Sequence, residues 1–448
     1  MVREWVDYSL GEVTVTNDST YSPKEAWPFV NYLDTSSITE NKIEEIQHLV
    51  TGIDKIPSRA RRKVAEGDVV YSNVRPNQKH YGIIRNPPEN FLVSTGFTTI
   101  RANPNLADTN FIYWFLSQAS VTEFLQTIGE NTASAYPSIK PSDIEGLNIT
   151  LPPLPEQKAI AHVLGSLDDK IELNRRMNET LEGMAQALFK SWIVDFDPVI
   201  DNALAAGNPI PEPLAQCAET RRQAIANGTA NRESAQAFPA SFRFTEELGW
   251  IPEGWEVKKI IEEVNLVMGQ SPSSDHYNQD GKGLPFHQGV TNYGERFPKH
   301  EQFSTGGNRI AEKGDILFSV RAPVGRINIA DQRLIIGRGL SALRHDMDCQ
   351  SYLVYFLKSF FQKEDSIGSG TIFNAVTKKD MENIPLISPS KELILAFNVK
   401  GDSFDARIPR NTKESQTLAK LRDVLLPKLI SGELRIPQAE KMVEEAIS

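Results

Sequence analysis

Residues 151–196 read LPPLPEQKAIAHVLGSLDDKIELNRRMNETLEGMAQALFKSWIVDF, and the architecture of the chain follows from this segment. Its apolar residues recur in heptads, which predicts one long helix with a seam for a partner helix. One seam position holds Ile160, Leu167, Asn174, Leu181 and Leu188, and the other holds Val163, Lys170, Met177, Met184 and Ser191. Pro155 suits a first helical turn and Glu156 complements the helix N-terminus. We therefore expect a helix over residues 155–195, roughly 60 Å long at about 1.5 Å per residue.

A second copy of this stretch follows later in the chain. Adding 237 to a residue number relates the two copies without a gap, and matched pairs are Asp143 with Asp380, Ala159 with Ala396, Asn174 with Asn411 and Leu188 with Leu425. Upstream, with insertions between, the run that begins Gly67-Asp68 matches the run that begins Gly314-Asp315. A period this long indicates a duplicated domain. The second helix is expected over residues 392–432, bent or restarted near Pro409.

The sequence therefore predicts an α+β chain with an internal pseudo-two-fold repeat. Two similar globular domains, residues 1–150 and 250–388, are joined by two long antiparallel coiled-coil helices, residues 151–196 and 389–435. Residues 197–249 are rich in Pro and small residues, which indicates a linker with one helix near residues 214–226. We expect amphipathic helices over residues 110–128 and 351–362, and a frayed acidic tail over residues 436–448.

Composition places the chain among cytoplasmic proteins. With 448 residues, of which 40% are hydrophobic, it can bury two ordinary cores. Two cysteines, Cys217 and Cys349, exclude a disulfide framework. We find neither a signal sequence at the N-terminus nor a run of about 18 apolar residues that would span a membrane. The net charge of −10 argues against a protein that coats nucleic acid without regard to sequence.

Basic residues nevertheless cluster at equivalent places in the two domains. Residues 55–85 carry six more positive than negative charges, and residues 309–344 carry four more. Both stretches include the Gly-Asp run, so each domain is expected to have one basic face. Arg, Lys and amide side chains contact phosphates and base edges. The candidate DNA-binding residues are Arg59, Arg61, Arg62, Lys63, Arg75, Asn77 and Lys79 in the first domain, and Gln288, Thr291, Asn292, Arg321, Arg326 and Arg338 in the second.

Two motifs suggest catalysis but fail on inspection. Asn86-Pro87-Pro88 begins the Asn-Pro-Pro-aromatic motif of adenine methyltransferases, but Glu89 cannot stack on a flipped base. Asp143, Glu156 and Lys158 imitate a nuclease metal site, but a helix N-terminus favours Glu156 anyway. The seven His residues show no ligand-like spacing. We therefore predict neither a catalytic site nor a metal site in this chain.

Four segments resemble the specificity subunits of type I DNA restriction-modification systems. They are the long stretch quoted above, ELGWIPEGWEV at residue 247, GDILFSVRAPVG at residue 314 and LRDVLLPKLISGEL at residue 421. The resemblance implies that each domain reads one half of a split sequence in double-stranded DNA, and that the helices dock two methyltransferase subunits. Catalysis would then belong to partners, the methyltransferase and restriction/translocase subunits. S-adenosylmethionine, ATP and Mg²⁺ would bind to those partners.

Two expectations concern the long helices. Asn174 and Asn411 fall at equivalent seam positions near mid-helix, so their amides are expected to meet and to fix the register; the alternative is that both face water. Phe189 and Trp192, near the helix end, are expected to dock a partner subunit. Two other functions stay open: a protein-binding adaptor without catalysis, and a modification enzyme that needs no partner.

Overall fold

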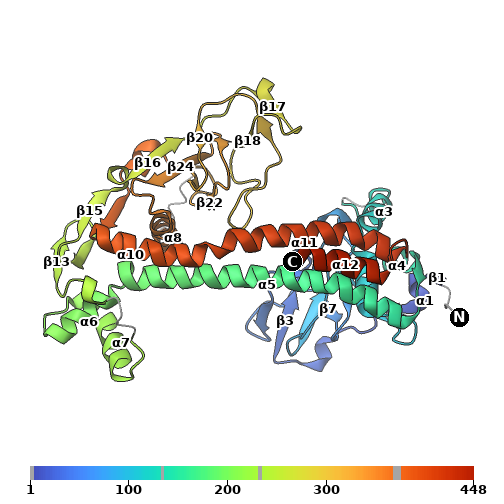
Figure 1. Cartoon of the computed structure of the whole chain (residues 1–448). Helices are drawn as coiled ribbons and strands as arrows, with labels where there is room; N and C mark the ends of the chain where they lie inside the picture. Colours follow the sequence, from blue (N-terminus) through green and yellow to red (C-terminus); the bar gives the residue numbers. More distant parts are fainter. Residues whose placement is uncertain (1–4, 133–135, 231–234, 367–374, 448) are drawn as a thin grey trace. The chain divides into compact units, whose positions relative to one another are not determined.

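The computed structural model describes residues 5–132, 136–230, 235–366 and 375–447 (Figure 1). They form two compact units, of which the first comprises Met1–Arg175 and Thr412–Ser448 and the second comprises Arg176–Asn411. The division falls inside the long helices and not at the expected domain ends near residues 150 and 388. Each globular domain therefore forms one body with the helix segments beside it.

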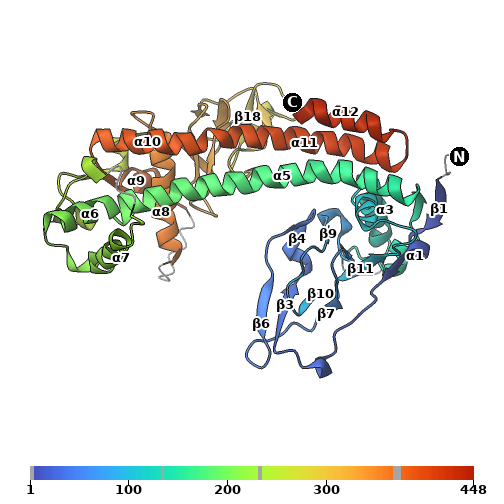
Figure 2. The ribbon, with the colours of Figure 1, turned by 60° about the horizontal axis from the view of Figure 1, so that its bottom comes forward.

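The first unit contains two four-stranded sheets (Figure 2). One has the order β6-β3-β10-β7 and the other has the order β2-β11-β8-β9. Strands β3 and β10 are parallel, and the other neighbours are antiparallel. Val70 and Phe97 from one sheet share a buried cluster with Leu33 and Val93 from the other. The strands are β2 Thr14–Thr16, β3 Phe29–Leu33, β6 Gln47–Val50, β7 Ala60–Lys63, β8 Val69–Ser72, β9 Tyr81–Ile83, β10 Phe91–Ser94 and β11 Phe97–Ala102.

The second unit repeats this topology, which confirms the predicted duplication. Its sheets have the orders β16-β24-β21-β22 and β17-β19-β18-β23-β20, and β18 and β23 form the parallel pair. The short ladder β1·β12 in the first unit likewise matches β15·β25 in the second. The strands are β1 Val6–Ser9, β12 Asn148–Leu151, β15 Glu256–Lys259, β16 Val264–Met268, β17 Tyr277–Asn278, β18 Leu284–His287, β19 Phe303–Ser304, β20 Ile310–Ala311, β21 Ile316–Ser319, β22 Ile327–Ile329, β23 Leu334–Ile336, β24 Leu340–His345 and β25 Pro385–Ser388.

The repeated Gly-Asp run has a structural role. Gly67 and Gly314 adopt φ of +85° and +88°, a conformation that favours glycine. The aspartate that follows is buried in both copies. Asp68 accepts two hydrogen bonds from Arg101, and Asp315 accepts one from Arg344 at 2.6 Å. Arg344 was counted above among the basic residues of the second domain, but its side chain binds Asp315 and stabilises the fold.

The central helix agrees closely with the prediction. Helix α5 runs over Leu154–Phe189 and continues as a π-helical turn over Lys190–Val194. In the first unit α5 lies antiparallel to α11, Arg407–Ile430. Residues of increasing number on α5 contact residues of decreasing number in the C-terminal part of the chain. The polar contacts between them pair Asp168 with Arg422 and Asn174 with Ser415, and Glu156 of α5 pairs with Arg435, which lies between α11 and α12.

The second helix is interrupted close to Pro409, as expected. Helix α10 runs over Lys391–Asp405, and α11 begins two residues later, after Ala406. Pro409 is the third residue of α11, where its missing N–H falls among amides that have no helical partner. The helix therefore restarts at Arg407, two residues before Pro409.

The stretch predicted as a linker, residues 197–249, is part of the second unit's core. Helices α6, Asp197–Ala206, and α7, Ala215–Ala226, lie side by side (Figure 1). The carboxylate of Asp201 is fully buried and accepts a hydrogen bond from Arg221 Nε at 2.8 Å. The helix near residues 214–226 is confirmed, but its neighbour α6 was missed.

Two further predictions on helices were wrong. Residues 110–128 were expected to form one helix but form two, α2 Thr109–Leu116 and α3 Ala119–Glu130. The helix expected over residues 351–362 is present as α8, Gln350–Ser366. The tail is not frayed, because α12 runs over Ile436–Ile447. Ala439 of α12 belongs to the first unit's core, and Val443 packs against that core. Their spacing of four residues indicates one face of a helix, which the acidic composition of the tail had led us to overlook.

The packing of α12 gives a test. Ala439 is 0% exposed, so Ala439→Asp would bury a carboxylate without a partner. We expect the free energy of unfolding of the first unit to fall by about 3 kcal/mol, as measured by urea denaturation. Glu440→Ala, at the exposed neighbouring position, should leave it within about 0.5 kcal/mol. Equal stability of the two variants would show that α12 does not pack.

Candidate nucleic-acid interface

A group of loops meets at one end of the first unit's sheets. The connection between β10 and β11 holds Thr95 and Gly96. Thr95 N donates to Arg59 O at 2.8 Å, and Asn73 N donates to Gly96 O at 2.7 Å. These bonds bring Arg59, which precedes β7, beside the β8–β9 loop that carries Arg75. We call Arg59, Asn73–Arg75 and Thr95–Gly96 the first tip.

The second unit repeats the bond between two of these loops, but its third segment follows β18, the counterpart of β3, and does not precede β20. Arg338 and Gly339 connect β23 to β24. Gly339 N donates to Gln288 O at 3.0 Å, and Val320 N donates to Gly339 O at 2.9 Å. The second tip therefore consists of Gln288, Val320–Arg321 and Arg338–Gly339, and it unites three of the predicted DNA-binding residues.

Close packing fixes the main chain of the second tip. A Cβ on Gly337 would lie 2.8 Å from Gln288 Cα, and one on Gly339 would lie 2.6 Å from Gln288 O. Only glycine fits such an approach. Gln288 Oε1 accepts a hydrogen bond from Ser271 Oγ at 2.6 Å, which leaves Nε2 as the end of the amide that is available to a ligand. Arg338 is exposed between the two glycines. A fixed amide beside an exposed guanidinium has the chemistry that reads base edges.

In the first tip, Arg75 is held by its surroundings. Its φ is 50°, a left-handed conformation that costs a non-glycine residue on the order of 1 kcal/mol. Its guanidinium lies over the ring of Tyr136, 4.6 Å from the centroid. Tyr136 is 54% exposed, so the pair presents a cation and an aromatic face together. Such pairs contact phosphates and stack on bases. Sequence reasoning did not single out Tyr136, Asn73 or Ser271.

Other candidates in the first unit lie elsewhere. Lys63 pairs with Glu25 at 2.5 Å and lies over the ring of Trp27, so its charge is already used. Lys79 pairs with Glu40 and lines a cavity with Arg422 of α11, on the side of the long helices. The basic stretch over residues 55–85 therefore does not form one face.

The remaining candidates keep accessible positions or serve local structure. Arg61 donates to Ser58 O, and Arg62 Nε is buried without a hydrogen-bond partner among the described residues. Asn77 N donates to Gln126. In the second unit Thr291 is exposed, whereas Asn292 is half-buried and its carbonyl accepts from Lys299 N. Arg326 is exposed on the same β21–β22 loop as Arg321.

The predicted docking residues are buried. Phe189 is 2% exposed and Trp192 is 5% exposed, and both rings contact Phe397 in the second unit's core. They hold α5 to α10 and are not accessible to another protein, which corrects the prediction. Leu173 and Met184, each about half exposed on α5, are accessible instead.

The seam asparagines are buried as well, which excludes the alternative that they face water. Asn174 is 2% exposed and donates to Glu414 and to Ser415, at 3.1 and 3.3 Å. Asn411 is 3% exposed and donates to Asn178 Oδ1 at 2.9 Å. Asn174 thus binds Ser415, four residues beyond Asn411, and Asn411 binds Asn178, four residues beyond Asn174. A direct contact between the two amides stays a prediction.

A chain of hydrogen bonds through two histidines begins at the residue that precedes Gln288 of the second tip. The residue before Gln288, His287, is buried, and its Nε2 lies 3.0 Å from His300 Nδ1. His300 Nε2 lies 2.9 Å from Asp331 Oδ1. Since His300 donates to the carboxylate, its Nδ1 accepts from His287. Burial, with the neighbouring His300 ring, lowers the pKa of His287 to about 4.

This buried histidine predicts a pH dependence. Between about pH 4 and 6.5 the unfolded chain binds more protons at His287 than the folded chain, so stability falls as the pH falls. From pH 7 to pH 5 we expect the second unit to lose about 2 kcal/mol through this residue. His287→Leu should remove this share of the loss in urea denaturation at the two pH values. Burial also lowers the pKa of His345, so the informative quantity is the difference between parent and variant. Identical pH slopes would contradict a neutral His287.

The described residues contain no cluster of three or more His, Cys, Asp or Glu side chains that could hold a metal ion. In the same residues no helix is both long and apolar enough to cross a membrane.

Comparison with known proteins identifies the family. The model of the type I restriction modification DNA specificity domain matches residues 2–183 and 252–394. The HindI specificity subunit of Haemophilus influenzae is 28% identical over 97% of this chain and its own full length. The MjaIX specificity subunit of Methanocaldococcus jannaschii is 24% identical over 96% of this chain and 92% of its own.

A solved S subunit from M. genitalium shares the fold, with a TM-score of 0.50 and 17% identity, covering 95% of this chain and 96% of its own. The two matched ranges contain the two tips and most of both units, and they cover well over half of the chain. The chain therefore belongs to the type I restriction-modification DNA specificity family.

Proposed function

We propose that this chain recognises DNA sequence within a type I restriction-modification complex, and that each unit reads one half of a split target through its tip. The chain itself is not catalytic. One observation carries the proposal: the same main-chain bond joins two loops at the tip of both units, from Asn73 to Gly96 and from Val320 to Gly339, and each tip carries an exposed arginine. Adaptors that bind only proteins have no need of two such junctions.

Partners supply the chemistry in this proposal. Two methyltransferase subunits bind one chain, since each unit offers an equivalent site, and restriction/translocase subunits complete the complex. S-adenosylmethionine, ATP and Mg²⁺ bind to these subunits and not to this chain. The complex acts on double-stranded DNA in the cytoplasm.

The half-site model predicts that the tips act independently. Arg59→Ala with Arg75→Ala should weaken DNA binding through the first half-site about 10- to 100-fold, and Gln288→Ala with Arg338→Ala should do the same through the second. Lys63→Ala is the matched control, because its charge is already paired. Affinity is measured with DNA carrying one intact and one scrambled half-site, and methylated adenines are mapped in the reconstituted complex.

The outcomes separate the functions. A DNA reader should lose affinity steeply between about 50 and 200 mM salt. If both tip variants bind DNA like the parent while remaining folded, or if affinity ignores both salt and sequence, the chain is a protein adaptor. Binding of S-adenosylmethionine by the chain alone would instead indicate a self-sufficient enzyme.

Because the seam asparagines are buried, we expect leucine at both positions to keep the helix pair stable but to relax the spacing between the two half-sites. Asn174→Leu with Asn411→Leu replaces polar seam contacts by apolar ones, while Glu414 keeps Lys170 as its partner. The helix pair should be at least as stable in thermal unfolding, since half-buried Asn178 and Ser415 can bind water. The variant should also methylate targets whose spacer is one base pair longer or shorter, because slipped registers are no longer penalised. Strict spacing in the double variant would contradict a register role.

A further inference from the structure

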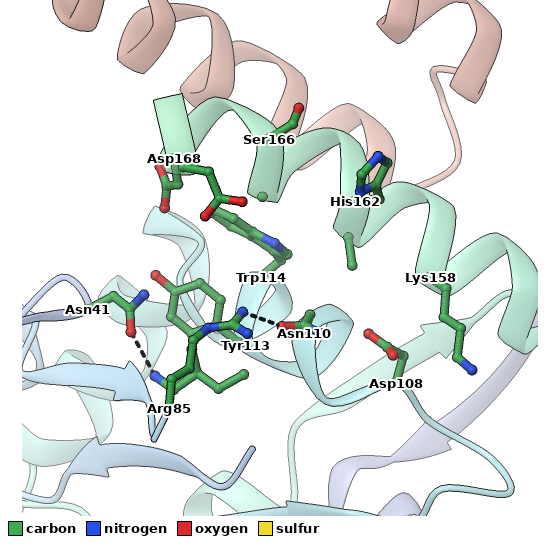
Figure 3. Close-up of a pocket in the computed structure, with 14 residues that line it drawn as sticks. Asn41, Arg85, Asp108, Asn110, Tyr113, Trp114, Lys158, His162, Ser166 and Asp168 are labelled. Atoms are coloured by element: carbon green, nitrogen blue, oxygen red, sulfur yellow. Dashed lines mark hydrogen bonds between the residues drawn. The ribbon is translucent and has the colours of Figure 1, made fainter. Parts of the chain in front are cut away.

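A polar cavity of about 390 Å³ in the first unit has no role in the tips (Figure 3). Its walls are α2, the first half of α5, and the strand end that carries Arg85. Tyr113 and Trp114 form its apolar floor and are buried. A cavity of this size accepts a side chain or a small ligand.

One side of the cavity offers hydrogen-bond donors. Arg85 Nη2 donates to Asn110 Oδ1 at 2.8 Å, and Ile83 N donates to Asn41 Oδ1 at 2.8 Å. Because both amide oxygens are engaged, the amide nitrogens of Asn41 and Asn110 are the ends that remain. Neither nitrogen has a hydrogen-bond partner among the described residues. Figure 3 shows the Asn41 nitrogen turned away from the strand, on the same side as Arg85. A guanidinium with two amide donors is a receptor for a carboxylate.

The second unit shows what belongs in this place. By the 237-residue repeat, Gly165 corresponds to Asp402 and Ala161 corresponds to Asn398. Asp402 accepts hydrogen bonds from Ser351 Oγ and Asn398 Nδ2, both at 2.8 Å. Ser351 begins the run that matches Asn110 onward. The second unit thus fills the equivalent space with its own carboxylate.

The first unit lacks that carboxylate and keeps the room for it. A Cβ on Gly165 would meet nothing within 4 Å. Arg85, whose guanidinium lines the cavity, adds a positive charge that the described residues of the second unit do not place beside Asp402. Asp168, on the opposite wall, already pairs with Arg422 at 2.6 Å. The missing part is one acidic group beside Arg85.

We propose that this cavity receives an acidic side chain of a partner protein, which takes the place that Asp402 occupies in the second unit. The proposal rests on the proposed function, and the partner is the methyltransferase subunit docked beside the first unit. A nucleic-acid backbone suits the cavity less well. Asp168 is paired with Arg422, and Asp108 and Asp169 equal Arg85 and Lys158 in number. The lining therefore offers Arg85 to one carboxylate but no excess of positive charge to a run of phosphates.

The first test restores the repeat's own residue. Gly165→Asp places a carboxylate in the cavity and should lower the affinity of the chain for the methyltransferase subunit at least tenfold. Gly183→Asp is the matched control, because Gly183 is also on α5, is exposed, and has open space around it. It should change that affinity less than twofold. Both affinities are measured by titration calorimetry with the full chain.

The second test removes the receptor. Arg85→Gln should weaken subunit binding about 10- to 100-fold, and Arg85→Lys should weaken it less because the charge remains. This pair decides the question if Gly165→Asp fails to fold. DNA affinity of the chain alone should be unchanged in every variant.

Unchanged subunit binding in both Gly165→Asp and Arg85→Gln would overturn the proposal. An equal loss of DNA binding by the isolated Arg85→Gln chain would also overturn it, in favour of a phosphate as occupant. If the parent chain does not bind DNA at all, the proposed function fails, whereas the subunit affinities still judge the cavity.

Discussion

A carboxylate at one repeat position anchors a long helix in each unit. Asp168 in the first unit accepts from Arg422 Nη1 at 2.6 Å, and burial raises its pKa. Asp405, its equivalent in the second unit, accepts from Tyr355 Oη and pairs with Arg296 Nη2, both at 2.9 Å. Removing one partner from the Arg296–Asp405 pair, in which Arg296 is buried, costs about 3 to 5 kcal/mol, because the other charge is left unpaired. In the second unit the position of the globular domain on α10 depends on these groups.

The basic partner of this carboxylate comes from a different part of the chain in each unit. In the second unit Arg296 comes from the globular domain and also pairs with Glu182 of α5 at 2.7 Å. In the first unit Arg422 comes from α11, so the bond joins the two helices. The first unit has Gly165 where the second has Asp402, and it keeps a cavity where the second is filled. Divergence after duplication thus created a feature that neither copy's sequence displays alone.

The sequence predicted those parts of the molecule that depend on periodicity. The heptads of residues 151–196 and the 237-residue repeat were enough to place α5 and to duplicate the domain. They could not show that Phe189 and Trp192 meet Phe397, because that contact joins residues some 200 positions apart. Lys63 and Lys79 looked like Arg59 in sequence, but Glu25 and Glu40 neutralise them from separate segments. Charge counts along the chain identify where bases are common and not which of them are free to bind.

The tips show how such a fold can change its DNA target without losing stability. The main-chain bond from Asn73 to Gly96 in the first unit is equivalent to the bond from Val320 to Gly339 in the second. The neighbouring side chains differ, because Thr95 occupies the position equivalent to Arg338. A backbone hydrogen bond does not depend on the side chain of the residue that makes it. Exposed side chains at the tips contribute little to the core, so their substitution typically changes stability by about 0.5 kcal/mol or less. Glycines at 337 and 339 are the exception, since they let the main chain approach Gln288. Evolution of a new target is therefore expected to vary residues such as Arg338 while it keeps the glycines on either side.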